Sequence, residues 1–501
     1  MSQQFERIAV NEKRRVITEK KKVDCKTEIA TESINKILNV GAFTFVSRPE
    51  YNKGKINYTG KTVFYICYED SEGKIVKAEC GCEYAGALED TVKSDNAKVI
   101  LKADVVKTEF DASQLKLIVI AYVEIKAEVT DCVTKEALTG GENLVCDLKE
   151  QTYHKSLGVR SVIFPIEEEF EVSYPIGEVL YHRADAIITS SQCGVGEIIV
   201  DGEIRLSAVL LQKGEKEVII RDDKRFPFKA EIESEEANPS MTSVAWANEK
   251  TFKTDVTVDQ ERGVSQVSLA MSLDIFGEAF REENISLATD VFSLTNELKV
   301  ERGETTVEVP TPERAVGIRV SLTNTVDDLA QGASLKAVGG ERAEIVALDK
   351  KDDCVVAVGT LSAVGYFTTA EGKCFTRRIE APFEVTLDCA VGDVVEFEGC
   401  VRAENASLRI LSNDEIEITA ELIFSIRPKV NVKMTYVKSV EALGEKQPNE
   451  NAISVYIARE GETLWDLAKR LNSTPEDIQN TNKDLQFPLT ENERIVVYRQ
   501  K

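Results

Sequence analysis

The feature that most constrains this 501-residue chain is an internal repeat of strand-like segments. In three stretches a strand-like run meets a glycine, a second run follows, and a Gly-containing turn comes 12 or 13 residues later. A partly apolar segment follows each turn, at residues 83–85, 226–228 and 381–383. The three leading glycines are Gly60, Gly202 and Gly359. Three matches in the same order, with matching internal offsets, predict three copies of one module.

A second alternating stretch closes each copy, at residues 115–126, 265–276 and 415–426. A period of two with β-branched residues indicates half-buried strands. A glycine inside such a run indicates a bulge or a close approach of two backbones. We therefore predict a mainly β fold with three repeated antiparallel β-sandwich or barrel-like domains.

The pattern also predicts where the segments begin and end. A short N-terminal head and a polar linker with Gly and Pro flank the repeats, and a different module ends the chain. The predicted segments are the head 1–18, the β-domains 19–150, 151–284 and 285–438, the linker 439–452 and the C-terminal module 453–501.

Composition narrows the class of protein. The chain holds 86 Asp and Glu against 62 Lys and Arg, a net charge of −24, which disfavours nucleic-acid binding. No apolar run is long enough for a membrane-spanning helix, and no secretory signal is apparent, so we expect a cytoplasmic protein with reduced thiols. Cys80 and Cys82 are the only close cysteine pair and the chain has two His residues. No catalytic motif appears, so we expect no catalytic residue, no metal and no cofactor.

The last 50 residues have a helical pattern that the rest of the chain lacks. Residues 453–457 are strand-like, Thr463 with Asp466 has the spacing of a capping box, and Thr474 begins a second helix. Residues 494–498 form a closing strand. These signals predict a small βααβ domain.

This module resembles a LysM domain. The match runs through Tyr456, Gly461, Glu462, Thr463, Leu464, Trp465, Leu467, Ala468, Ile478, Asn482, Leu485 and Leu489. LysM domains bind N-acetylglucosamine-containing glycans in a shallow groove between two loops. The resemblance therefore implies a glycan- or partner-binding groove lined by Gly461, Glu462, Thr463, Leu464, Trp465, Phe487, Pro488 and Leu489. Trp465 is either a lid on the core or an exposed aromatic anchor.

The repeats together with this tail resemble SPOCS-domain proteins of spore-forming Firmicutes, in particular the SipL-type spore-coat morphogenetic proteins. The resemblance implies a non-enzymatic scaffold on the mother-cell side of the forespore surface, which docks coat proteins there. Its implied partners are a coat morphogenetic protein, the basement-layer ATPase, and an N-acetylglucosamine-containing glycan or lipid-linked precursor. The alternative is an exported envelope protein that binds peptidoglycan- or chitin-type glycans, and a third option is a divergent relative in a bacterium that does not sporulate.

Overall fold

A computed structural model describes residues 3–93, 97–214, 218–311, 314–326, 329, 332–351, 354–388, 396–412, 414–447 and 453–498. It confirms a mainly β fold built from antiparallel sheets. Most of the strands form three sheet pairs, which follow one another along the chain. Among the described helices, none is long and apolar enough to cross a membrane.

The first sheet pair covers residues 3–141. One sheet has the order β1 (Gln3–Ala30), β7 (Lys116–Gly141), β6 (Ala97–Asp111), and a 3-10 turn, η1 (Thr31–Ser33), follows β1. In the other sheet β4 (Lys55–Asp70) pairs with β2 (Ile34–Val46), β3 (Glu50–Asn52) and β5 (Ile75–Glu89).

The second sheet pair covers residues 144–293. Its sheets have the orders β8 (Leu144–Val172), β13 (Val264–Ser293), β12 (Thr242–Asp259) and β9 (Ile176–Cys193), β10 (Glu197–Gln212), β11 (Val218–Glu233).

The third sheet pair covers residues 296–445. Here β20 (Glu415–Glu445) pairs with β14 (Asn296–Val309), β15 (Arg314–Thr325) and β19 (Glu396–Ile410). The second sheet has the order β16 (Ser334–Lys351), β17 (Cys354–Thr368), β18 (Cys374–Leu387). In all three pairs the last long strand lies between the first strand and the strand before the last, while three consecutive long strands form the opposite sheet.

Alternation along the strands builds a core inside each sheet pair. In β7, Leu117, Val119, Ala121, Val123 and Ile125 are all fully or almost fully buried, and the residues between them are less buried. Because successive side chains point to opposite faces of a strand, one face of β7 covers the opposite sheet. Equivalent clusters fill the second and third pairs.

The three leading glycines occupy the same place in their sheets. Gly60 lies opposite Tyr84, Gly202 opposite Phe228 and Gly359 opposite Phe383 on the neighbouring strand. A Cβ atom at any of the three glycines would overlap the facing aromatic ring. The glycine therefore allows the ring to lie flat across the neighbouring strand, which is the close approach that the sequence predicts.

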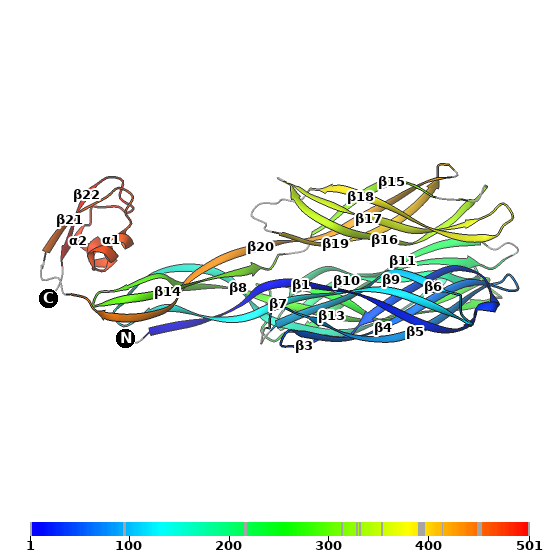
Figure 1. The fold of residues 1–501 in the computed structure, drawn as a ribbon, viewed down its shortest axis with the longest axis horizontal. Coiled ribbons are helices and arrows are strands. Elements are labelled where there is room, and N and C mark those ends of the chain that lie inside the picture. The colour runs from blue at the N-terminus through cyan, green and yellow to red at the C-terminus, as the bar shows by residue number, and fades with distance from the viewer. Residues whose placement is uncertain are drawn as a thin grey trace.

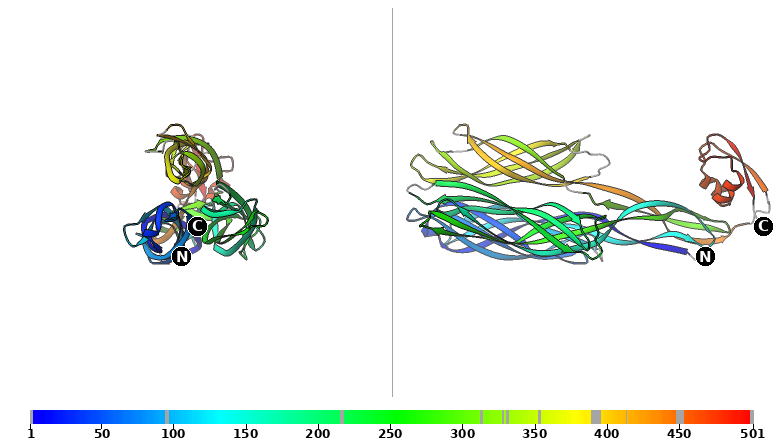
Figure 2. Two further views of the ribbon diagram at one scale, coloured as in Figure 1. Left: turned by 90° about the vertical axis from the view of Figure 1, so that its right-hand side faces the viewer. Right: turned by 180° about the vertical axis from the view of Figure 1, so that it is seen from behind.

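Beyond the sandwiches, the outer strands continue as three two-stranded ribbons, which we call the stalk. The ribbons pair residues 3–12 with 131–141, 144–156 with 280–293, and 296–309 with 430–445. The sheet pairs lie side by side around a common centre, and the stalk leaves them at one end (Figures 1 and 2).

All six strands of the stalk contribute to one apolar cluster. It consists of Ile8, Ala137, Tyr153, Ile285, Leu287, Val307, Met434 and Tyr436. A second cluster nearer the tip contains Leu138, Ala288, Val291, Val437 and Val440. Each ribbon thus buries its apolar face against the other two.

The outer strands are interrupted where sandwich becomes stalk. The register of β1 shifts between Glu12 and Arg15, and that of β8 shifts around Gly158, which has a positive φ of 87°. In the third pair the strand is broken outright between β14 and β15, where Pro310 cannot donate to the ladder. These irregularities let each strand leave its sandwich and join the shared core.

The structure places several predicted boundaries inside strands. Residues 3–18 of the predicted head belong to β1, and residues 439–445 of the predicted linker belong to β20. The predicted boundary after residue 150 falls inside β8, and the one after 284 falls inside β13. The chain instead passes between sheet pairs at short turns near residues 142 and 294, because the apolar alternation runs on into the stalk.

Candidate functional site

The C-terminal module consists of β21 (Ile453–Ala458), α1 (Leu464–Leu471), α2 (Pro475–Thr481) and β22 (Glu493–Tyr498). The capping box predicted at Thr463 and Asp466 is present, with the Asp466 amide donating to Thr463 Oγ1 at 3.1 Å. Thr474 caps α2, as predicted, through the Asp477 amide. Leu467, Ala468, Leu471 and Ile478 are buried beneath the β21–β22 sheet.

The structure brings the two predicted groove walls together. The Gly461 amide donates to the Leu489 carbonyl at 2.7 Å, and the Leu489 amide donates to the Glu462 carbonyl at 3.2 Å. These groups bond across the predicted groove to each other. A sugar in this groove would therefore meet the remaining backbone groups and the side chains of the two loops.

The side chains of the walls are held in different ways. The Glu462 carboxylate accepts from the Arg459 amide at 2.7 Å and pairs with Arg470, also at 2.7 Å. Leu489 is buried, Leu464 and Phe487 are half-buried, and Pro488 is exposed after a cis peptide bond. Leu464 and Phe487 thus form the apolar surface between the loops.

Asn482, one of the positions of the LysM match, ties the end of α2 to the closing strand. Its amide nitrogen donates to the Val496 carbonyl at 2.8 Å, and its amide oxygen accepts from the Val496 amide at 2.9 Å. The side chain replaces a missing strand partner, which explains why an amide suits this position.

Trp465 does not face the groove. Its Nε1 donates to Asp290 Oδ2 of β13 at 3.0 Å, and its ring packs edge-on against Phe292 with the ring centroids 5.2 Å apart. Of the two roles left open by the sequence, neither describes it fully, because the ring lies between the module core and the tip of the stalk.

Asp290 forms two of the polar bonds between the C-terminal module and the stalk. Besides Trp465, it accepts from Lys469 of α1 at 2.6 Å and from Arg302 of β14 at 2.5 Å. Burial would raise the pKa of Asp290, but the hydrogen bonds from Lys469 and Trp465 outweigh burial and lower the pKa below its usual value. The carboxylate therefore stays ionised at neutral pH and joins the module to two stalk strands.

The turn between β13 and β14 completes the contact. Phe292 is buried in the core of the module, and the Asn472 side chain donates to the Leu294 carbonyl at 2.8 Å. Lys446 donates to the Ser293 carbonyl at 2.7 Å and to Asn472 Oδ1 at 2.8 Å. A groove of roughly 860 Å³ with Arg302, Lys446, Lys469 and Arg470 along it remains beside these contacts.

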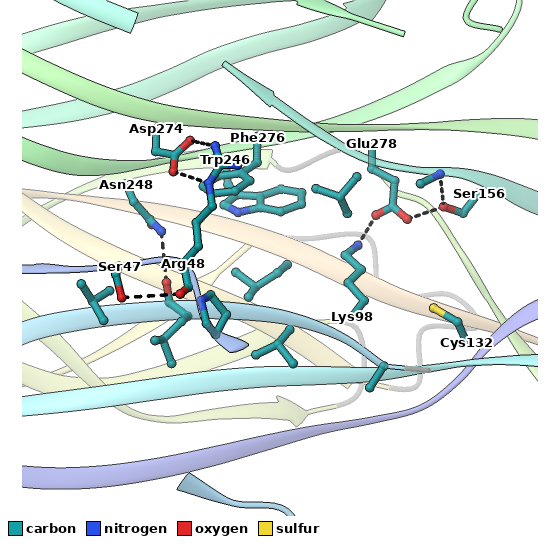
Figure 3. Close-up of a pocket in the computed structure, with 18 residues that line it drawn as sticks. Ser47, Arg48, Lys98, Cys132, Ser156, Trp246, Asn248, Asp274, Phe276 and Glu278 are labelled. Atoms are coloured by element: carbon teal, nitrogen blue, oxygen red, sulfur yellow. Dashed lines mark hydrogen bonds and ion pairs between the residues drawn. The ribbon is translucent and has the colours of Figure 1, made fainter. Parts of the chain in front are cut away.

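Sequence reasoning missed a pocket of roughly 330 Å³ between the first and second sheet pairs (Figure 3). Trp246 of β12 and Phe276 of β13 form one wall, with parallel rings whose centroids are 5.5 Å apart. Arg48 from the first pair donates to both oxygens of Asp274, at 2.9 and 2.7 Å, and Lys98 pairs with Glu278. The alternation of β13 places Asp274, Phe276 and Glu278 on one face, but it does not show that this face meets another sheet.

The titratable groups in these places are held by ion pairs or by burial. Both carboxylates in the pocket are engaged by cations from the neighbouring sheet pair, so neither is an unoccupied general base. Cys80 and Cys82 lie on β5, and burial, followed by the neighbouring Cys25 thiol, raises the pKa of both thiols. Among the described residues, no group of three or more His, Cys, Asp or Glu side chains is arranged to hold a metal ion.

No protein-family model, curated protein or solved structure matches this chain.

Proposed function

We propose that this protein is a non-enzymatic scaffold of the SPOCS–LysM type that acts in spore-coat assembly. Its three sheet pairs are copies of one protein-docking module, and its C-terminal module is a LysM head. The shared strand order and the repeated glycine–aromatic pairs support the repeat. The strand–helix–helix–strand order and the two caps support the head.

One observation carries the scaffold proposal. The C-terminal module sits on the tip of a stalk to which every sheet pair contributes one ribbon. The module is thereby displayed at one end of a long body (Figure 1). Such a shape suits a protein that attaches at one end and presents sheet edges along its length.

The outer face of the β21–β22 sheet favours a protein partner for the head. Ile453, Val455, Ile457 and Tyr498 are exposed there, on the side away from the helices. Exposed apolar side chains grouped on one face are typical of protein interaction sites. The proposed partner is the basement-layer ATPase of the coat, and the proposed location is the cytoplasm on the mother-cell side of the forespore. A glycan or lipid-linked precursor in the groove remains the second ligand of this proposal.

The test follows recruitment in a sporulating host. We expect an N-terminally tagged chain that ends at residue 447 to lose its place at the forespore surface while its circular dichroism still reports the β body. Ile457→Asp should weaken recruitment strongly and Leu464→Asp only weakly. Undiminished recruitment of the shortened chain would contradict the proposal.

A sedimentation assay tests the glycan-binding alternative. Full-length protein is mixed with insoluble peptidoglycan, and the Leu464→Asp and Ile457→Asp variants are compared. Tight binding that only Leu464→Asp abolishes, combined with recruitment that Ile457→Asp leaves unchanged, would favour the exported envelope protein over the scaffold.

A further inference from the structure

A charged cavity lies where strands of all three sheet pairs meet, far along the chain from the C-terminal module. Its volume is roughly 580 Å³, within the usual range for small-molecule sites. Eight Lys or Arg and seven Asp or Glu side chains line it, whereas the whole chain has a strong excess of acid. The cavity is therefore a local exception to the charge of the chain.

Three guanidinium groups converge on one part of this cavity. Arg205 of β10 forms ion pairs with Glu203 and with Glu404 of β19, and Arg225 of β11 lies 3.4 Å from the same Glu404 carboxylate. Arg402, two residues before Glu404 on β19, lines the cavity as well. Arg205 and Arg225 thus pair with these two carboxylates, and Arg402 adds a third positive group, which has no ion pair within the described ranges.

The mutual repulsion of these groups affects Arg205. Burial lowers the pKa of Arg205, and repulsion from Arg225 and Arg402 adds to this effect against the attraction of Glu203. The three guanidinium groups are therefore close enough to repel one another electrostatically.

Two hydrogen-bond donors in the cavity lack an acceptor. Within the part of the chain that the structure describes, Arg402 Nε and Ser207 Oγ are buried and find no hydrogen-bond partner, and Arg402 forms no ion pair. The carboxylate oxygen Glu341 Oε2 in the same cavity is also buried without a hydrogen-bond partner among the described residues, although Glu341 pairs with Arg221 through its other oxygen. Most other cations of the cavity pair with a carboxylate, as Arg183 does with Asp185 and Arg342 with Glu344. Buried donors without partners are costly, and an unseen ion is a common explanation.

We propose that this cavity binds a small phosphorylated molecule, whose phosphate oxygens accept from Arg402 and Ser207 and lie between Arg205 and Arg225. A guanidinium matches a phosphate well, because its N–H groups form a planar fork that can donate two parallel bonds. The remaining volume would accommodate the rest of the ligand. Because the cations come from β10 and β11 on one side and β19 on the other, the ligand joins the second and third sheet pairs. This site is independent of the proposed role in coat assembly.

Pyrophosphate is the probe for the first experiment. Isothermal titration of the full chain, at constant ionic strength set with sodium chloride, should show one site. Arg402→Met should weaken binding by about tenfold to a hundredfold, as expected for losing a hydrogen bond to a charged group. The matched control is Arg319→Met, which removes an exposed arginine from β15 and should leave affinity unchanged. Inorganic phosphate and a sugar phosphate, titrated in parallel, show whether the site prefers a free anion or a phosphorylated molecule.

Thermal unfolding separates binding from folding. Pyrophosphate should raise the melting temperature of the wild type and of Arg319→Met but not of Arg402→Met, because a ligand of the native state stabilises it. Without ligand, Arg402→Met should unfold no earlier than the wild type, since the change removes a buried charge that has no partner. Absence of binding to the wild type, or equal affinity in all three proteins, would overturn the proposal.

Discussion

The sandwiches and the stalk are built from the same strands, yet they bury apolar side chains in different ways. In the sandwiches, β7 or β20 packs on the opposite sheet of its own pair, and each core closes within one stretch of the chain. In the stalk, no ribbon has a second sheet of its own, and the core exists only because six strands from three pairs meet. The stalk therefore has no core except the one that all three pairs share, whereas the sandwiches have cores of their own besides a cluster shared among the three pairs around Leu38, Val209 and Tyr366.

The sharpest test of this difference uses two fully buried residues on one strand, β20. Phe424 lies in the third sandwich and Met434 in the stalk. We expect Phe424→Ala to lower the free energy of unfolding by about 3–5 kcal/mol, because it leaves a large cavity in a closed core. Met434→Ala should cost about 2 kcal/mol, since the ribbons can partly close the gap.

Denaturant unfolding with hydrogen exchange read by mass spectrometry checks both changes. Met434→Ala should speed exchange in residues 3–12, 144–156 and 430–445 together and leave the sandwich strands protected. Faster exchange confined to the 430–445 ribbon would show that the ribbons are independent of one another.

A smaller change in the free energy of unfolding is expected when a glycine of either region is replaced by alanine. A Cβ atom at Gly359 in the third sandwich would overlap both the Glu344 carbonyl oxygen and the Phe383 ring, whereas Gly444 near the end of β20 has nothing within 4 Å of a built Cβ atom. Gly359→Ala should therefore cost about 1–3 kcal/mol through overpacking. Gly444→Ala should leave stability unchanged or raise it by about 0.5 kcal/mol. Thermal and denaturant unfolding measure both, and equal effects would mean that the Phe383 ring and the Glu344 backbone both move aside freely.

The smallest effect concerns the contact between stalk and module. Asp290→Asn removes the charge to which Lys469, Arg302 and Trp465 donate. We expect the free energy of docking of the C-terminal module on the stalk to weaken by about 1 kcal/mol. Because the pKa of Asp290 is lower in the folded protein, its contribution is present above the ordinary Asp pKa and is lost as the pH falls through the folded value. Docking should thus be constant near neutral pH and weaken below about pH 4.

The fluorescence of Trp465 reports this contact in a Trp246→Phe background, since the chain has two tryptophans. Glu297→Gln, an exposed carboxylate beside the same groove, is the matched control and should change nothing. If Trp465 fluorescence changes at the same pH in the Asp290→Asn variant and in its parent, Asp290 does not cause the pH dependence of docking.

The comparison also shows where sequence reasoning reaches its limit. Local features can be predicted from the sequence. Spacing and residue type indicate the helix caps at Thr463 and Thr474, and they indicate the close approach at Gly60, Gly202 and Gly359. The stalk cannot be predicted from the sequence, because the alternation of a strand does not show whether its apolar face meets the second sheet of its own pair or the ribbons of two other pairs. The placement of Trp465 was also beyond reach, since its partners Asp290 and Phe292 are more than 170 residues away in the chain.

The stalk has a mechanical consequence for whatever the protein joins. Both chain ends lie at the stalk end of the molecule (Figure 1). A force applied between the start of β1 and the C-terminal module would peel β1 from β7 beginning at the Gln3–Gly141 pair, so that ladder bonds break one after another instead of all at once. Under tension the protein would lengthen by unzipping its ribbons, while the sandwiches behind them carried little of the load.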